Sequence, residues 1–197
     1  MKKLQANVSR ILLNLLQPVI KYLGSLHMPF SHKKITGKEV SEIISLLKPG
    51  QVILAQTRGE LSNLLISGFW KHAAIVLDSN TIIEAVGKGV IKKDIITFLM
   101  AKDHILVLEP TFTDENSMII AANWCLLQVG SPYDYDFRSK NKAYYCAELP
   151  ADAYNAIVPN CPFKPRSVWG TERYTPQQYA EATSKWKQIW NSEGLPK

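Results

Sequence analysis

The chain has 197 residues, of which 46% are hydrophobic and 20% are charged, and this is the composition of an ordinary globular protein. The length is sufficient for one domain with a full hydrophobic core, or for one domain with an appendage. The three cysteines stand at irregular spacings, which argues against a disulfide framework and suits a reducing compartment such as the cytoplasm.

The net charge of +6 is concentrated at the N-terminus. Six of the 23 basic side chains and none of the 17 acidic ones lie in residues 1–34, so the rest of the chain is balanced. A nucleic-acid-binding protein usually carries a basic stripe on its folded body, and no such cluster is present. We therefore expect no nucleic-acid partner.

Residues 1–34 are predicted to form a basic amphipathic helical segment that precedes a domain at residues 35–197. Apolar residues at positions 4, 8, 11, 12, 15, 16, 19, 20 and 23 follow the spacing of one helical face, which Pro18 interrupts. Such a helix either packs on its own domain or makes a peripheral contact with an anionic membrane. Polar residues in the apolar run argue against a signal peptide, and no uncharged run reaches the roughly 18 residues of a transmembrane span.

The remaining sequence predicts an α+β domain with an antiparallel sheet flanked by helices. Periodicity and turn residues indicate, in chain order, a helix at residues 36–48, strands at 51–55, 72–77 and 81–86, a helix at 94–101, a strand at 104–109, and helices at 114–129, 147–157 and 175–190. Thr36, Asp94 and Thr175 are the expected N-caps of three of these helices. Residues 87–89 are expected to form a turn that closes the third strand.

The strands at residues 72–77 and 81–86 are expected to form a hairpin. Neither strand alternates apolar with polar residues, so both faces should be covered and any ionisable group should have a partner. The two such groups are His72 and Glu84. A three-residue turn at residues 78–80 would place Glu84 opposite Ala74, on the face of His72 and within reach of its side chain.

A buried imidazole beside a carboxylate has two readings. It is the base half of a catalytic triad that needs only a nucleophile from elsewhere in the chain. Alternatively, His72 is a core histidine bonded to a backbone carbonyl, and Glu84 is merely its neighbour. A third residue, the nucleophile, has to decide between these two interpretations of His72.

The three cysteines differ in their surroundings. Cys125 lies inside a predicted helix at a position that suits a small apolar residue, so core packing is its expected role. Cys161 lies in a proline-rich loop without an evident base. Cys146 opens the helix predicted at residues 147–157, where the helix dipole favours a thiolate. A buried structural cysteine is the alternative for this position as well.

Motifs of other chemistries are absent from the sequence. It contains no Gly-x-Ser-x-Gly, no His-Glu-x-x-His and no Cys-x-x-Cys, and its other histidines show no ligand spacing. No metal or organic cofactor is therefore implied.

Five segments together carry a resemblance to a known family; they are residues 50–54, 69–75, 83–85, 130–134 and 145–149. Their order resembles the permuted branch of the NlpC-type, papain-like cysteine hydrolases, the YiiX/YebB-like group, over about residues 48–170. The resemblance implies a circularly permuted papain-like fold in which the histidine strand precedes the cysteine. It also implies that Cys146 is the nucleophile, that His72 is the general base and that Glu84 orients His72.

Two positions depart from the pattern of that family. Gln51 stands where relatives commonly have Asp, which should affect only a turn. Pro150 stands where an aliphatic residue is usual, and proline is tolerated only in the first turn of a helix. If Cys146 is the N-cap, Pro150 removes the first ladder bond, so the helix should begin at Ala147 or be distorted.

The expected function is that of a papain-like cysteine peptidase or amidase, which cleaves a peptide or cell-wall-type amide through a thioester intermediate. A lipid acyltransferase or deacylase with the same triad is an alternative, and a non-catalytic binding module is another. The expected partners are a small peptide, amide or acyl-lipid substrate, with peripheral membrane contact through residues 1–34. The sequence does not indicate an oligomeric state.

Overall fold

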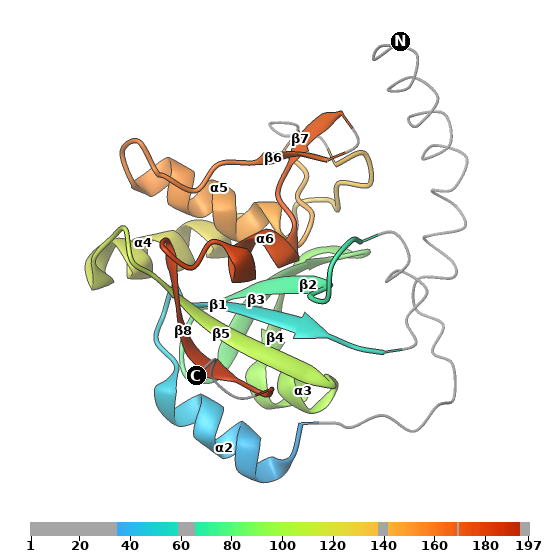
Figure 1. Cartoon of the computed structure of the whole chain (residues 1–197), viewed down its shortest axis with the longest axis vertical. Coiled ribbons are helices and arrows are strands. Elements are labelled where there is room, and N and C mark those ends of the chain that lie inside the picture. The colour runs from blue at the N-terminus through green and yellow to red at the C-terminus, as the bar shows by residue number, and fades with distance from the viewer. Residues whose placement is uncertain (1–34, 59–65, 138–141, 169, 194–197) are drawn as a thin grey trace.

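The computed structural model describes residues 35–58, 66–137, 142–168 and 170–193. The elements in chain order (Figure 1) are α2 (Gly37–Leu46), β1 (Val52–Gln56), β2 (His72–Val76), β3 (Thr81–Val86), β4 (Gly89–Asp94), α3 (Ile95–Met100), β5 (His104–Pro110), α4 (Glu115–Leu126), α5 (Glu148–Ile157), β6 (Arg166–Val168), β7 (Thr171–Arg173), α6 (Pro176–Glu181) and β8 (Trp186–Asn191). The helical segment predicted at residues 1–34 lies outside the described residues. Within the described part of the chain, no helix is both long and apolar enough to cross a membrane.

Six strands form one antiparallel sheet in the order β4-β3-β2-β1-β5-β8. Helices α4, α5 and α6 pack on one face of this sheet, and α2 and α3 pack on the other (Figure 1). Both faces of the central strands are therefore buried, which explains why these strands are continuous apolar runs. The predicted α+β class, with helices flanking an antiparallel sheet, is confirmed.

Alternate residues of each central strand belong to two separate hydrophobic cores. In β1, Val52 and Leu54 pack with the layer of α4 and α5, whereas Ile53 and Ala55 pack with the layer of α2 and α3. Fully burying an aliphatic side chain of the size of Val, Leu or Ile contributes roughly 1.5–3 kcal/mol. A register slip of one residue would exchange the two cores, so this packing fixes the register of the central strands.

The β2–β3 hairpin has the predicted three-residue turn. Val76 pairs with Ile82, and the N–H of Leu77 donates to the carbonyl of Thr81, which leaves residues 78–80 as the turn. Within the turn, the carboxylate of Asp78 accepts from the backbone N–H two residues ahead, as Asp does in an Asx turn.

Strand β4 was not expected from the sequence pattern, although the turn before it was. Residues 87 and 88 connect Val86 to Gly89, and the two strands pair as far as Thr81 and Asp94. Gly89 has a φ of +107°, and the carbonyl of Ser131 lies where its Cβ would be, so a side chain does not fit. This contact holds the loop around Ser131 against the start of β4.

The prediction of one long helix over residues 175–190 is wrong. The Thr175 cap and the proline after it are as predicted, but α6 ends at Glu181 and the chain then forms β8. Strand β8 pairs with β5 at the edge of the sheet, and its Trp186 is buried against the ring of Tyr179. The spacing of the apolar residues here suits a helix, and pairing with β5 overrides this local preference.

Candidate active site

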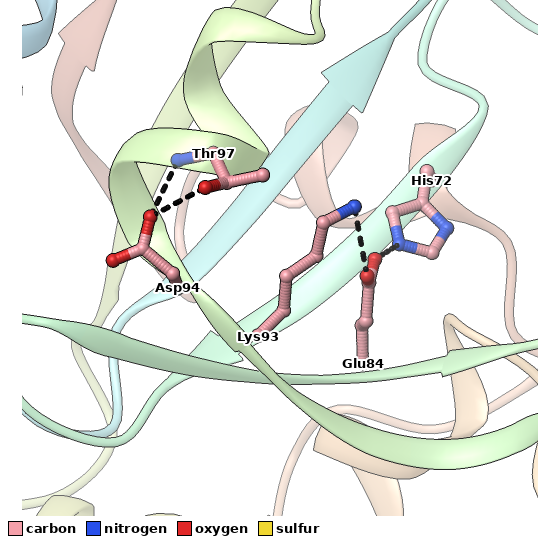
Figure 2. Close-up of polar contacts among 5 residues, drawn as sticks. All are labelled: His72, Glu84, Lys93, Asp94 and Thr97. Atoms are coloured by element: carbon pink, nitrogen blue, oxygen red, sulfur yellow. Dashed lines mark hydrogen bonds and ion pairs between the residues drawn. The ribbon is translucent and has the colours of Figure 1, made fainter.

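The hairpin brings His72 and Glu84 together as the parity of its turn predicts. Glu84 pairs with Ala74, so it lies on the same face as His72 and diagonal to it. The Nε2 atom of His72 and the Oε2 atom of Glu84 are 2.7 Å apart (Figure 2). The side chain of Glu84 is 2% exposed and that of His72 is 18% exposed. The imidazole is therefore bonded to a carboxylate at the rim of the core, which removes the alternative of a histidine bonded to a backbone carbonyl through this nitrogen.

The electrostatics of the pair favour the charged forms of both residues. Burial by itself would lower the pKa of His72, but the hydrogen bonds and charges of Cys146 and Glu84 outweigh it and raise this pKa to about 9. Burial would likewise raise the pKa of Glu84, but the bond and charge of His72, with the charges of Lys93 and Lys102, lower it to about 2. An imidazolium thus faces a carboxylate throughout the neutral range.

Cys146 reaches this pair from the other helical layer. It lies immediately before Ala147, the N-cap of α5, and it is close enough to His72 to raise the pKa of the imidazole by hydrogen bonding and by charge. Because Glu84 occupies Nε2 of the ring, Nδ1 is the nitrogen left for the thiol. The start of α5 also turns the positive end of the helix dipole toward this region. The three residues that the sequence predicts as a site are therefore in one chain of contacts.

Pro150 determines where α5 begins. The N–H of Leu149 donates to the carbonyl of Tyr145, which is the bond of an incipient helical turn. Pro150 has no N–H for the carbonyl of Cys146, so the regular helix starts at Glu148 and Pro150 is its third residue. A proline is tolerated in the first turn of a helix. Cys146 therefore precedes the N-cap rather than forming it.

The other two cysteines have no comparable surroundings. Cys125 is fully buried in α4, and burial raises the pKa of its thiol well above the ordinary value. Cys161 is 1% exposed, and burial raises the pKa of its thiol too. Both agree with the structural roles expected from the sequence.

Tyr133 lies beside the segment that carries the thiol, although sequence reasoning assigned it no role of its own. An isolated bridge pairs it with Tyr144, two residues before Cys146. Burial and the charge of Cys146 raise the pKa of Tyr133 well above its ordinary value, so its hydroxyl remains a proton donor at neutral pH.

Lys93 is a second residue that sequence reasoning missed. Its Nζ atom lies 3.4 Å from Oε1 of Glu84, the oxygen that does not bind His72 (Figure 2). Counting back from a two-residue turn at positions 87 and 88 would place Lys93 opposite Ile82, on the face of Glu84, which is the observed register. The length of that turn was therefore the sequence feature from which the position of Lys93 could have been predicted.

A thiol at the start of a helix, bonded to an imidazole that a strand-borne carboxylate holds, is the arrangement of a papain-like cysteine hydrolase. In this chain the histidine strand precedes the cysteine helix, which is the permuted order. Residues 46–190 match the model of the family described as permuted papain-like amidase enzyme, YaeF/YiiX, C92 family. The chain therefore belongs to this family of papain-like amidases.

A solved structure shares the fold. The chain is similar to the metalloprotein yiiX from Escherichia coli O157:H7, with 19% identity over 57% of this chain and 67% of that chain, and a TM-score of 0.50. A search of curated proteins found no match. In the parts of this chain that the structure describes, no three or more His, Cys, Asp or Glu side chains are grouped as metal ligands would be.

Proposed function

We propose that this protein hydrolyses an amide bond, of a peptide or of a cell-wall-type substrate, with Cys146 as the nucleophile. One observation supports this above the others: the imidazole of His72 is bonded to a buried carboxylate, and it lies close enough to Cys146 for the cysteine to raise its pKa. A structural histidine does not need both partners, whereas a general base does.

The chemistry follows from these contacts. His72 holds the proton that leaves the Cys146 thiol, as an imidazolium, and the thiolate attacks the carbonyl carbon of the substrate. The resulting imidazolium then donates its proton to the leaving amine as the C–N bond breaks, which leaves a thioester on Cys146. Water attacks the thioester, His72 takes a proton from it, and the thiol and a free carboxylic acid are regenerated.

The tetrahedral intermediate carries a negative oxygen that needs hydrogen-bond donors. The backbone N–H of Cys146 is one donor, because it belongs to the residue that forms the covalent bond. Glu84 keeps the imidazole in one orientation and compensates its positive charge.

The experiment is a substrate panel of short peptides, cell-wall-type amides and acyl lipids, assayed with the wild type and with Cys146→Ala. The proposal requires release of an amine from at least one amide, accumulation of an acyl adduct on Cys146 by mass spectrometry, and loss of both in the variant. Turnover confined to acyl lipids would favour an acyltransferase or deacylase instead. Binding without turnover, equal in the two proteins, would favour a non-catalytic module.

A further inference from the structure

Glu84 divides its two oxygens between two cations. Oε2 lies 2.7 Å from Nε2 of His72, and Oε1 lies 3.4 Å from Nζ of Lys93 (Figure 2). Since Glu84 is 2% exposed, water has little access to replace either partner. Lys93, Glu84 and His72 thus form a continuous chain of charges that ends at the thiol of Cys146.

The fold aims Lys93 at Glu84 rather than at solvent. The β3–β4 register pairs Lys93 with Ile82, so its side chain lies on the face of Glu84 and diagonal to it. The ammonium lies 5.7 Å from the ring centroid of Phe98, and that ring is also 6.1 Å from the imidazole of His72. One buried aromatic ring from α3 therefore contacts both cationic partners of the carboxylate.

Other charged groups around Glu84 do not duplicate this contact. Lys102, which follows α3, has its Nζ atom 5.2 Å from the ring centroid of Phe98 and acts on Glu84 through its charge. Asp94, the next residue of β4, is turned away and caps α3 through Thr97 (Figure 2). The direct contact of 3.4 Å with the carboxylate of Glu84, on the oxygen that does not bind His72, is thus made by Lys93.

A constant cation matters because the charge of His72 changes during the reaction. When the imidazolium gives its proton to a leaving group, the buried carboxylate loses the positive charge on its Oε2 side. A buried carboxylate without a counter-charge is costly, and it responds by taking up a proton or by turning away. Either response would release His72 from its orientation toward Cys146.

We propose that Lys93 is a positioning residue of the proposed active site: it holds the second oxygen of Glu84 and keeps this carboxylate ionised while His72 loses and regains its proton. This inference rests on the proposed function for its purpose. The effect of Lys93 on the ionisation of Glu84, however, can be measured without a substrate.

The test compares Lys93→Met, which keeps most of the stem and removes the charge, with Lys93→Arg, which keeps the charge. Lys92→Met is the matched control, because Lys92 is the exposed neighbour on the same strand and its loss changes the net charge equally. Two quantities are measured: the titration midpoint of the Glu84 carboxyl by carbon NMR, and the rate of Cys146 alkylation by iodoacetamide as a function of pH.

In Lys93→Met the Glu84 midpoint should rise by about half a pH unit, as expected for a partly exposed ion pair, and the acidic limb of the alkylation profile should move in the same direction. Lys93→Arg should restore both quantities, and Lys92→Met should resemble the wild type. The proposal is overturned if Lys93→Met and Lys92→Met share the wild-type midpoint and pH profile, even where the melting temperature falls. If wild-type Cys146 shows no preferential alkylation, the proposed hydrolase function is contradicted, and the Glu84 midpoint alone decides on Lys93.

Discussion

The hydroxyl of Tyr145 accepts a hydrogen bond of 2.8 Å from the backbone N–H of Tyr174. Both residues are buried, and Tyr145 directly precedes Cys146, so this bond fastens the end of β7 to the segment that carries the thiol. On the other side of Cys146, the hydroxyl of Tyr179 donates to the carbonyl of Ala147 at 2.7 Å. The nucleophile segment is thus held by two tyrosine hydroxyls and by the C-terminal part of the domain.

Replacing Tyr145 by Phe should destabilise the protein. The substitution leaves the buried N–H of Tyr174 without its acceptor, and such a loss costs about 1–3 kcal/mol. Urea unfolding should show it as a lower midpoint with an unchanged slope. Tyr135→Phe is the matched control, because its hydroxyl bonds the carbonyl of Gly87 at the surface and should matter less. Equal losses in the two variants would contradict the role given to the Tyr145 bond.

Thiol labelling should distinguish the three cysteines. We expect iodoacetamide to modify Cys146 first, because it contacts an imidazole, whereas burial raises the pKa values of the Cys125 and Cys161 thiols. Peptide mapping after short exposure near neutral pH measures the order. His72→Ala should slow the labelling of Cys146 and leave the other two unchanged. Uniform labelling of the three would count against nucleophilic catalysis.

Hydrolysis should lose rate on the alkaline side as pH rises through about 9, the pKa to which its partners raise His72. The sign follows from the direction of the shift: the imidazolium that protonates the leaving amine is present below this value and is lost above it. The same pairing adds to stability fully below the ordinary histidine pKa of 6.5, and this contribution disappears as pH rises through about 9. Plots of kcat/KM and of unfolding free energy against pH measure both effects.

Glu84→Gln should move this alkaline limb to lower pH. The amide keeps the size of the carboxylate but removes the charge that helps to raise the pKa of His72, and burial then lowers that pKa. At pH 10, where His72 is mostly deprotonated in both proteins, we expect kcat/KM to be about tenfold lower than in the wild type, which corresponds to a shift of one pKa unit. Glu42→Gln, on the exposed surface of α2, is the control and should leave the limb in place. An unchanged limb in Glu84→Gln would show that Glu84 does not act on His72.

Deletion of residues 1–34 tests the basic N-terminal segment, which lies outside the described residues. If the segment lies on membranes, binding to anionic vesicles should disappear while hydrolysis of a small soluble substrate remains, because each Lys or Arg near an anionic surface contributes roughly 1 kcal/mol. If it packs on the domain instead, the deletion should lower the melting temperature. Vesicle binding by the shortened chain equal to that of the full chain would eliminate the membrane contact through this segment.

The hairpin and its pair could be predicted because local rules decide them. The length of the turn at residues 78–80 sets the parity of the strands, and parity alone places Glu84 on the face of His72. The capping box of Thr36 with Glu39 is likewise local, and it starts α2 as expected. Such features depend on residues a few positions apart.

The parts that were missed depend on distant partners. Strand β8 exists because β5 offers it an open edge and because Trp186 is buried against Phe112, Tyr154 and Phe163, and neither is visible in residues 175–190 alone. Cys146 and His72 are 74 positions apart in the chain, and only the resemblance to a family could suggest that they meet. The position of Lys93 depends on the register of β4 with β3. No alternating pattern in the sequence indicated that β4 is a strand.

The permuted order of the site also has a consequence for the synthesis of the protein. The ribosome releases β1 to β5, with His72 and Glu84, well before the segment that contains Cys146, and a domain generally folds as a unit. The imidazole and the carboxylate are therefore made first, but the site can form only when α5 is available to dock. Because the hydroxyl of Tyr145 accepts from the N–H of Tyr174, the final placement of Cys146 also requires residues that are made later still.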